Sequence, residues 1–159
     1  MSGVEATAVI QLIVASALGG LIGLERSVFG KQAGMRTYAL VALASCVLTV
    51  MSVLVSSSYI GLTSFDPLRV AAAIVMGIGF IGTGIVVHRE GSNPMGVTTT
   101  AGIWVAAAIG ISVGFRLYIL AIATAILTLI IFTAFSRVER AIQNKVRGSL
   151  LANSGEEHQ

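Results

Sequence analysis

The polar residues that border the apolar stretches of this chain are the first candidates for chemistry. Glu25 and Arg26 end one apolar stretch, and Arg36 and Thr37 begin the next. A carboxylate and a guanidinium on the two sides of one short connection predict a Glu25–Arg36 ion pair that ties two helices together, because charged groups beside apolar segments tend to be paired. The alternative is that both residues are interface anchors with no further role.

A run of hydroxyl groups, Thr98–Thr100, begins a later apolar stretch. With Glu25 as a gate, these hydroxyls and a helix broken at the glycines of residues 77–84 could form a path for an ion. Arg36 at a helix start could instead bind an anion. No nucleophile lies beside a candidate base in the sequence. We therefore predict no catalytic residues and a protein that is not an enzyme.

Candidate metal ligands are not gathered in any segment. No apolar stretch holds Asp or Glu in its middle, although carboxylate oxygens are the usual ligands of hard divalent cations. Cys46 is the single cysteine, and His88 and His158 stand alone. We therefore expect neither a metal site nor a bound cofactor.

The pair Asp66-Pro67 predicts the start of a helix. Asp66 can cap the helix and proline suits its first position. Arg69 follows three residues after Asp66, so its side chain could reach lipid phosphate or the Asp66 carboxylate. We favour a helix cap with an arginine that extends to the membrane surface.

The same segment contains Gly77, Gly79, Gly82 and Gly84. The first three match a GxGxxG pattern, but dinucleotide binding requires a preceding strand and an aqueous site, so we exclude it. Each glycine weakens a helix by about 1 kcal/mol relative to alanine. The segment is therefore either broken beside protein or a wet cavity, or an unbroken helix that packs tightly.

The composition is that of an integral membrane protein. The 159 residues are 55% hydrophobic and 11% charged, and their mean hydropathy is +0.92. Soluble domains carry about 25% charged residues, so a soluble globular enzyme, a disordered chain and a secreted disulfide scaffold are excluded. The net charge of +3 does not indicate nucleic-acid binding, because the basic residues form no face interleaved with aromatic ones. The first partner to expect is the lipid bilayer.

Five apolar runs are each long enough to cross a bilayer as a helix, which takes about 17–25 residues. They cover residues 8–24, 37–55, 68–88, 97–114 and 117–135. We therefore predict an all-α integral membrane protein, a bundle of five transmembrane helices formed by residues 1–136. Residues 137–159 form a basic tail, part of it either an amphipathic helix on the inner leaflet or a frayed, solvated segment.

The basic residues are unevenly divided between the two sides of the predicted bundle. By the positive-inside rule, this places the N-terminus outside and the C-terminus in the cytoplasm. The cytoplasmic side would hold Arg26, Lys31, Arg36, Arg89, Arg137, Arg140, Lys145 and Arg147, and the other side Arg69 and Arg116.

Small residues recur every four positions in two of the runs. Such stripes let helix backbones approach closely in a membrane. They predict packing within the bundle, with a groove that faces a partner as the alternative. The residues are Gly102, Ala106, Gly110 and Gly114 in the fourth run and Ala15, Gly19 and Gly23 in the first.

Several short motifs follow one another in a characteristic order. They are GLER at 23–26, AGMRT at 33–37, DPLR at 66–69, GIGFIGTG at 77–84 and GVTTTA at 96–101, followed by Trp104. Together they resemble the N-terminal membrane domain of the MgtC/SapB family, and the resemblance extends over nearly the whole chain to about residue 140.

The resemblance implies a multi-pass protein of the bacterial inner membrane that is linked to growth in low magnesium and, in pathogens, to virulence. It favours a non-enzymatic protein that modulates other membrane proteins, including the proton-driven ATP synthase. Helix–helix contact with itself or with a membrane partner would then be its mode of action. The alternative is a small transporter or channel for magnesium or another ion. Because residues 136–159 are all that follow the last run, the resemblance is to the short form, without the soluble cytoplasmic domain of long members.

The resemblance also assigns motif residues by position. At two further positions, 83 and 100, threonine stands where alanine is more usual in the family, which adds hydroxyls to a packed site. The motif residues are Glu25, Arg26, Arg36, Thr37, Asp66, Arg69, Thr98, Thr99 and Trp104, together with the four glycines of residues 77–84.

Overall fold

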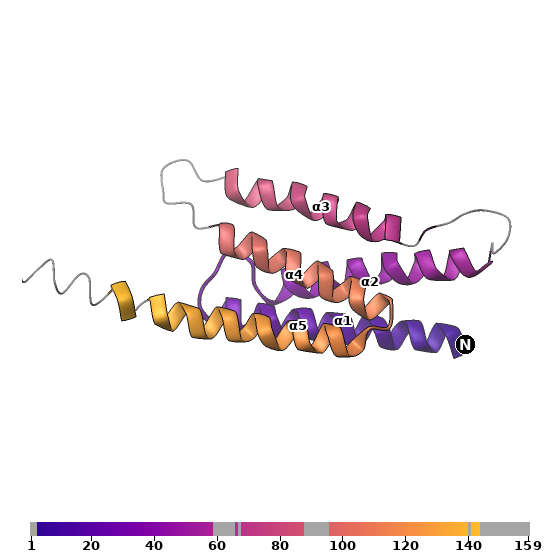
Figure 1. Cartoon of the computed structure of the whole chain (residues 1–159), viewed down its shortest axis with the longest axis horizontal. Helices are drawn as coiled ribbons and strands as arrows, with labels where there is room; N and C mark the ends of the chain where they lie inside the picture. The colour runs from indigo at the N-terminus through magenta and orange to yellow at the C-terminus, as the bar shows by residue number, and fades with distance from the viewer. Residues whose placement is uncertain (1–2, 59–65, 67, 88–95, 140, 144–159) are drawn as a thin grey trace, which may run out of the picture.

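The computed structural model describes residues 3–58, 66, 68–87, 96–139 and 141–143, which are helical apart from short connections. Five of its helices are long and apolar enough to cross a membrane, which confirms the predicted all-α bundle (Figure 1). The helices are α1 (Gly3–Val28), α2 (Met35–Ser58), α3 (Leu68–Val87), α4 (Val97–Gly114) and α5 (Tyr118–Ile130), which continues into a π-helical turn, η1 (Ile131–Phe135).

The helix boundaries differ from the predicted ones mainly in α1. The predicted range 97–114 is that of α4, whereas α1 begins before residue 8 and runs past Glu25 and Arg26 to Val28. Hydropathy marks where a helix crosses hydrocarbon, but backbone hydrogen bonding continues until another residue ends it. Glu25 and Arg26 are therefore held rigidly in the last turns of a helix and do not flank it.

A Schellman motif ends α1. Gly30 has a φ of 62°, in the left-handed region that favours glycine. The Lys31 N–H donates to the Arg26 carbonyl at 3.0 Å and the Gly30 N–H to the Ser27 carbonyl at 3.1 Å, which are the two bonds of this cap. The Ser27 hydroxyl then accepts the N–H of Met35 at 2.9 Å, where α2 begins. The turn thereby sets the direction in which α2 leaves α1.

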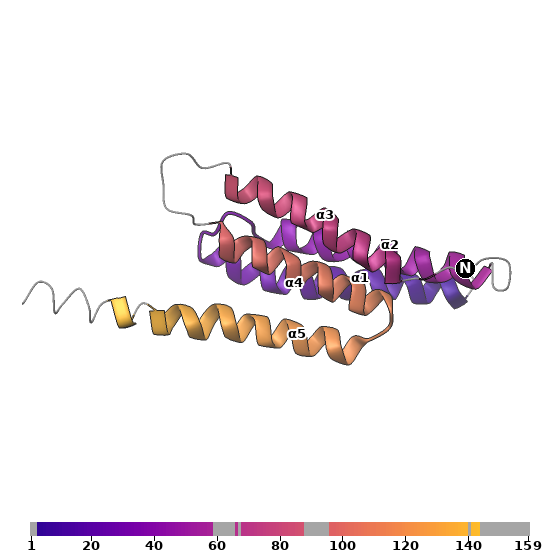
Figure 2. The ribbon, with the colours of Figure 1, turned by 45° about the horizontal axis from the view of Figure 1, so that its top comes forward.

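The central helix is α4, which contacts α1, α2, α3 and α5. The most extensive pairings join α2 to α1 and to α4, whereas α3 contacts mainly α4 and only weakly α2. Figures 1 and 2 show α3 and α5 on opposite outer sides of the bundle with α4 between them. As a consequence, α3 is the helix with the least support from the rest of the chain.

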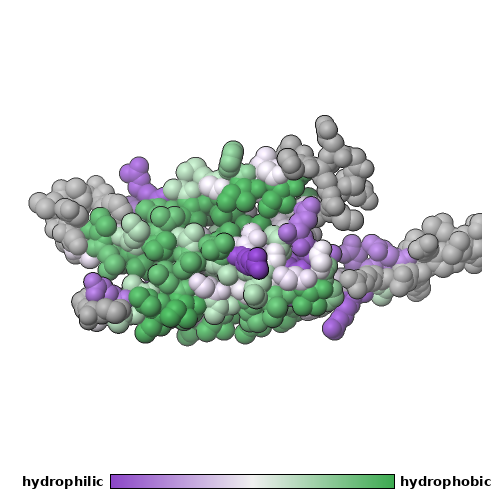
Figure 3. Space-filling model, turned by 180° about the vertical axis from the view of Figure 1, so that it is seen from behind, coloured by the Kyte–Doolittle hydropathy of each residue, from purple (hydrophilic) through white to green (hydrophobic). Residues whose placement is uncertain are grey.

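Side chains are distributed as in a protein surrounded by lipid. Phe80 and Ile119 are 84% and 87% exposed, whereas Gln11, Ser45 and Thr49 are buried inside the bundle. Figure 3 shows a broad apolar band over one face, with hydrophilic side chains mainly toward its ends. Because lipid tails are as apolar as these side chains, close packing and interior hydrogen bonds, rather than burial of apolar surface, must hold the helices together.

Gln11 is one such interior link, between α1 and the C-terminal end of α4. Its Nε2 donates to the carbonyl oxygens of Val113 at 2.7 Å and of Gly114 at 2.9 Å. The last carbonyls of a helix have no partner within the helix, and in hydrocarbon each unsatisfied one costs several kcal/mol. The buried amide of Gln11 therefore takes the place of water at this helix end.

Replacing Gln11 with leucine, a side chain of similar size, should lower the free energy of unfolding by about 1–3 kcal/mol. The Gly114 carbonyl loses the Gln11 donor, and the Val113 carbonyl keeps only the Arg116 N–H. Reversible unfolding by SDS in detergent micelles measures this. The matched control is Ser16→Ala, whose hydroxyl bonds only to Leu12 of its own helix and whose loss should cost less than about 0.5 kcal/mol. Equal losses for the two variants would show that the link to α4 does not matter.

The small residues of α1 and α4 are sites of close approach within the bundle. A Cβ added at Gly19 would lie 2.6 Å from the Tyr38 carbonyl oxygen, and one at Gly114 would lie 2.6 Å from the Thr49 Cβ. No real side chain tolerates such contacts, so these small residues lie where helices pack against each other within the bundle. The α4 stripe is buried along its whole length, at Gly102, Ala106, Gly110 and Gly114.

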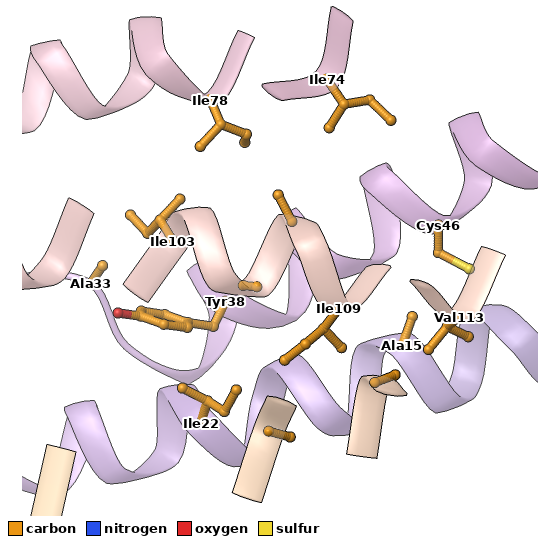
Figure 4. Close-up of a cluster of buried hydrophobic side chains, with 14 of the residues drawn as sticks. Ala15, Ile22, Ala33, Tyr38, Cys46, Ile74, Ile78, Ile103, Ile109 and Val113 are labelled. Carbon is orange, nitrogen blue, oxygen red and sulfur yellow. The ribbon is translucent and has the colours of Figure 1, made fainter. Parts of the chain in front are cut away.

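The glycines of α3 behave differently. This helix is unbroken from end to end, so the alternative of a broken segment is wrong, and Ile74 and Ile78 point from it toward the core (Figure 4). A Cβ at Gly82 would meet the Thr100 methyl group, which is tight packing. Tight packing does not account for the other three glycines of this helix. A Cβ would find nothing within 4 Å at Gly77, Gly79 and Gly84.

Several predictions on the ends of the bundle lie outside the described residues. The helix of α5 and η1 continues through 136–139 and 141–143, but the rest of the predicted basic tail is not described. His88, Arg89 and Pro67 also lie outside the described residues. Among the described cations, Arg26, Lys31, Arg36 and Arg137 lie toward one end of the bundle and Arg69 and Arg116 toward the other. The orientation with the N-terminus outside stays a prediction.

Candidate functional site

Four helical elements meet around Arg26, at the end of the bundle where α1 ends and α2 and α4 begin. Arg26 lies in the last turn of α1, Tyr38 near the start of α2, Thr99 in the first turn of α4 and Phe132 in η1. We call these residues, together with Glu25, the Arg26 cluster. Turns of the π type are rare and are often found at functional sites.

Arg26 is almost completely buried, with 6% of its side chain exposed. Its Nη2 donates to Thr99 Oγ1 at 3.4 Å, and its guanidinium carbon lies 4.4 Å from the centre of the Phe132 ring. The Tyr38 hydroxyl lies beside the guanidinium and donates to the Thr99 carbonyl at 3.3 Å. Burial of a cation costs several kcal/mol, of which a desolvated cation–π contact returns about 2 kcal/mol.

Glu25 supplies the negative charge of the cluster. Its side chain is 10% exposed, and its Oε2 lies 4.0 Å from Arg26 Nη1, which is an ion-pair distance but too long for a hydrogen bond. Glu25 Oε2 and Arg26 Nε are both buried without a hydrogen-bond partner. Because buried polar atoms are nearly always partnered, these two atoms mark the cluster as more than a packed core.

The predicted ion pair between Glu25 and Arg36 is wrong. Arg36 is exposed in the first turn of α2, and Glu25 pairs with the adjacent Arg26. The turn after α1 sets α2 so that Tyr38 faces the bundle. Residues two apart on a helix point about 200° from each other, so Arg36 must point away.

Gly102 makes room for the Arg26 cluster in α4. A Cβ at this position would meet both the Tyr38 hydroxyl and the Phe132 ring. The stripe of small residues, predicted as a packing device, therefore also positions the aromatic members of the cluster. Substitution of Gly102 would force Tyr38 and Phe132 away from Arg26.

The remaining motif candidates lie outside the cluster. Thr98 and Trp104 are exposed, and Thr37 is half-buried. Asp66 caps α3 as predicted, since its carboxylate accepts the Leu68 N–H at 2.9 Å. Among the described residues no ion pair joins Arg69 to Asp66, and both lie at the opposite end of the bundle. The predicted residues that the fold brings together are therefore Glu25, Arg26 and Thr99.

Tyr38 and Phe132 were missed by the sequence predictions because each lies in an apolar run where an aromatic residue is unremarkable. Tyr38 did carry a signal, since a hydroxyl inside a membrane segment requires a hydrogen-bond partner. Phe132 carried none. Its contact with Arg26 joins two helices far apart in the chain.

The chemistry available to the Arg26 cluster is that of charge and hydrogen bonding. Its carboxylate can accept a proton or contact a cation, and its guanidinium can hold an anion or a carbonyl. Within the described part of the chain, no group of three or more His, Cys, Asp or Glu residues is arranged to hold a metal ion.

Comparison with known proteins identifies the family. The model of the MgtC family matches residues 12–141. The chain is 39% identical over 142 residues to the "Putative magnesium transporter YhiD" of Escherichia coli (strain K12), covering 86% of this chain and 64% of that protein. It is 36% identical over 123 residues to Protein SapB of Bacillus subtilis (strain 168), covering 76% and 53%. With Protein MgtC of Brucella abortus (strain 2308) it shares 46% identity over 97 residues, covering 61% and 38%.

The chain spans less than two thirds of the length of these relatives. No solved structure matches it. The family match begins within α1 and ends beyond η1, so it includes the whole Arg26 cluster. The predicted resemblance is therefore confirmed: the chain belongs to the MgtC family and is a multi-pass protein of the bacterial inner membrane.

Proposed function

We propose that this protein is a non-enzymatic membrane protein that serves adaptation to low magnesium, and that it acts when α3 contacts a helix of a second copy or of another membrane protein. The magnesium context is supported by the relative from Escherichia coli, which is named a putative magnesium transporter. The contact mechanism is supported by one observation: three glycines of α3 face open space, whereas those within the transmembrane core of α1 and α4 are filled by neighbours.

Open glycines on an unbroken helix need a physical reason. Each one lowers helix stability by about 1 kcal/mol relative to alanine, and at Gly77, Gly79 and Gly84 no contact within the chain compensates. In membranes, small residues on a helix surface let a second backbone approach closely, which replaces the missing hydrophobic drive. A partner helix would supply these contacts at Gly79, whereas Gly77 and Gly84 lie on other sides of the helix.

One face of α3 is suited to such a contact. Ala72, Met76, Gly79 and Thr83 are spaced four, three and four residues apart, so they form a single line along the helix. We call this line the α3 stripe. Met76 is 71% exposed, and the Thr83 hydroxyl donates to the Gly79 carbonyl at 2.9 Å, so it needs no partner outside the helix. Apart from Met76 the residues of the stripe are small, Gly79 is half-buried and the other three are exposed, and the one hydroxyl of the stripe already has its acceptor.

The test is Gly79→Leu in a bacterial strain that carries this protein in place of its own family member. We expect growth in low-magnesium medium to be lost, because a leucine on the α3 stripe keeps the partner helix away. The matched control is Gly84→Leu. Its position is equally open but lies about 140° around the helix from Gly79, so growth should persist.

Both leucine variants must unfold at the same SDS concentration as the wild type, so that a growth defect reports contact and not folding. A cysteine placed by Ala72→Cys in a Cys46→Ser chain then distinguishes the partner: a disulfide-linked dimer in membranes identifies a second copy. If folded Gly79→Leu protein supports growth as well as the wild type does, the contact mechanism is wrong.

A second candidate function is ion transport through the Arg26 cluster, and the buried Glu25 Oε2 without a hydrogen-bond partner favours it. The path expected from the sequence is not formed, because α3 is unbroken, Thr98 is exposed and Thr99 bonds to Arg26. Of the residues in that path, Glu25 is the one in the Arg26 cluster with a buried oxygen atom that has no hydrogen-bond partner and can contact an ion.

Magnesium flux into sealed proteoliposomes tests this second function. If it holds, wild-type protein raises flux above that of empty liposomes, and Glu25→Gln returns flux to the empty level. Glu5→Gln is the control, since Glu5 lies exposed at the far end of α1 and its change should leave flux unaltered. Absence of flux from demonstrably folded protein would exclude direct magnesium transport.

A further inference from the structure

A groove of about 630 Å³ separates α3 from α2. Leu40 and Leu48 line it from α2, and Ala73 and Gly77 from α3, so its walls are apolar. Arg69 lines it as well, in the first turn of α3. The groove is a different face from the α3 stripe and lies outside the Arg26 cluster.

The groove exists because α3 packs on α4 rather than on α2. Ile74 and Ile78 are buried toward the core, and Gly82 meets Thr100 of α4. On the side toward α2 the residues at 73 and 77 are too small to close the gap, and a Cβ at Gly77 would find nothing within 4 Å. In a bilayer an apolar space of this size does not stay empty.

Arg69 places a positive charge at one end of this apolar space. Its backbone N–H bonds to the Asp66 carbonyl, but among the described residues its guanidinium makes no ion pair. Arg69 lies at the end of the bundle opposite Arg26, where a transmembrane helix begins and hydrocarbon gives way to lipid headgroups. A guanidinium there matches the geometry of a phosphate, to which it donates two parallel hydrogen bonds.

We propose that the groove between α2 and α3 binds a phospholipid, with its phosphate on Arg69 and an acyl chain along Ala73 and Gly77. Charge and shape both select this occupant. The groove has a cation at one end and an apolar wall along the rest of its length. A single phospholipid molecule matches both, with its phosphate and its acyl chain. A bound lipid would also fill the gap that leaves α3 poorly supported by α2.

The experiment is native mass spectrometry of the purified, delipidated full chain titrated with dioleoyl phosphatidylglycerol. We expect one tightly bound lipid per chain. Arg69→Gln should weaken its binding about tenfold, as expected for loss of a charge-assisted hydrogen bond. Arg116→Gln is the matched control, because Arg116 lies at the same end of the bundle but does not line the groove.

A second pair of variants tests the acyl-chain position. Gly77→Leu fills the groove and should prevent lipid binding, whereas Gly84→Leu should not, since Gly84 is equally open but does not line the groove. Equal loss in the two arginine variants would show non-specific attraction and overturn the proposal. Unchanged lipid binding in Gly77→Leu would also overturn the proposal. If that variant loses dimer mass but still binds the lipid, the groove binds a second copy instead.

Discussion

Replacing Arg26 with alanine should lower the free energy of unfolding by about 3–5 kcal/mol, the usual cost of removing one partner from a buried ion pair. The Glu25 carboxylate, nine-tenths buried, would lose the cation 4.0 Å away. Phe132 and Thr99 would lose their contacts with the guanidinium in the same step. Arg26→Lys should fall between alanine and the wild type, because an ammonium keeps the charge but lacks the planar stack on the ring.

The double variant Glu25→Gln with Arg26→Met is the decisive comparison. Replacing both charges by neutral side chains of similar size leaves no buried charge, so most of the loss should be recovered. SDS unfolding of all four proteins in one detergent gives the comparison directly. If the double variant is no more stable than Arg26→Ala, the cluster is held by contacts of the arginine side chain rather than by charge.

Gly110→Leu should lower the free energy of unfolding by more than about 3 kcal/mol. Overpacking commonly costs about 1–3 kcal/mol when side chains can shift, but here the added Cβ alone would meet the Ala42 carbonyl oxygen of α2. A backbone atom cannot rotate away, so the two helices must separate along one of the most extensive interfaces of the bundle. We expect insertion into the membrane without formation of the folded bundle.

The control for this change is Gly84→Leu, which adds the same side chain where nothing lies within 4 Å. Its unfolding free energy should equal or slightly exceed that of the wild type, because leucine favours a helix more than glycine does. Protease resistance in membranes and SDS unfolding report the two variants together. Similar losses at both positions would mean that the added bulk is harmful wherever it is placed and that close packing of α4 on α2 is not the cause.

Composition and hydropathy alone were enough to predict five helices and, for α4, both of its ends. Their power comes from the membrane, since a backbone in hydrocarbon must satisfy its own hydrogen bonds and an apolar run of the right length has no other structure to form. The same reasoning did not predict where α1 begins and ends. Glu25 and Arg26 were interpreted as the end of the helix, yet α1 continues to Val28 and is capped by the left-handed Gly30.

Within the candidate site, spacing predicted the stripe of small residues and placed Glu25, Arg26 and Thr99 near one end of the bundle. It did not predict which charge Glu25 would pair with. That choice depends on the rotation of α2 about its axis, which the turn after α1 sets by turning Tyr38 inward and Arg36 outward.

Local pattern thus established the class of protein, the number of helices and the candidate polar residues, because each of these properties belongs to one stretch of chain. The fold decided which glycines are filled and which are open, which ring covers Arg26, and where a groove remains beside Arg69. These features depend on how helices distant in the chain are rotated and how closely they approach. Periodicity within one helix identifies a face, but the residues that meet that face come from other helices.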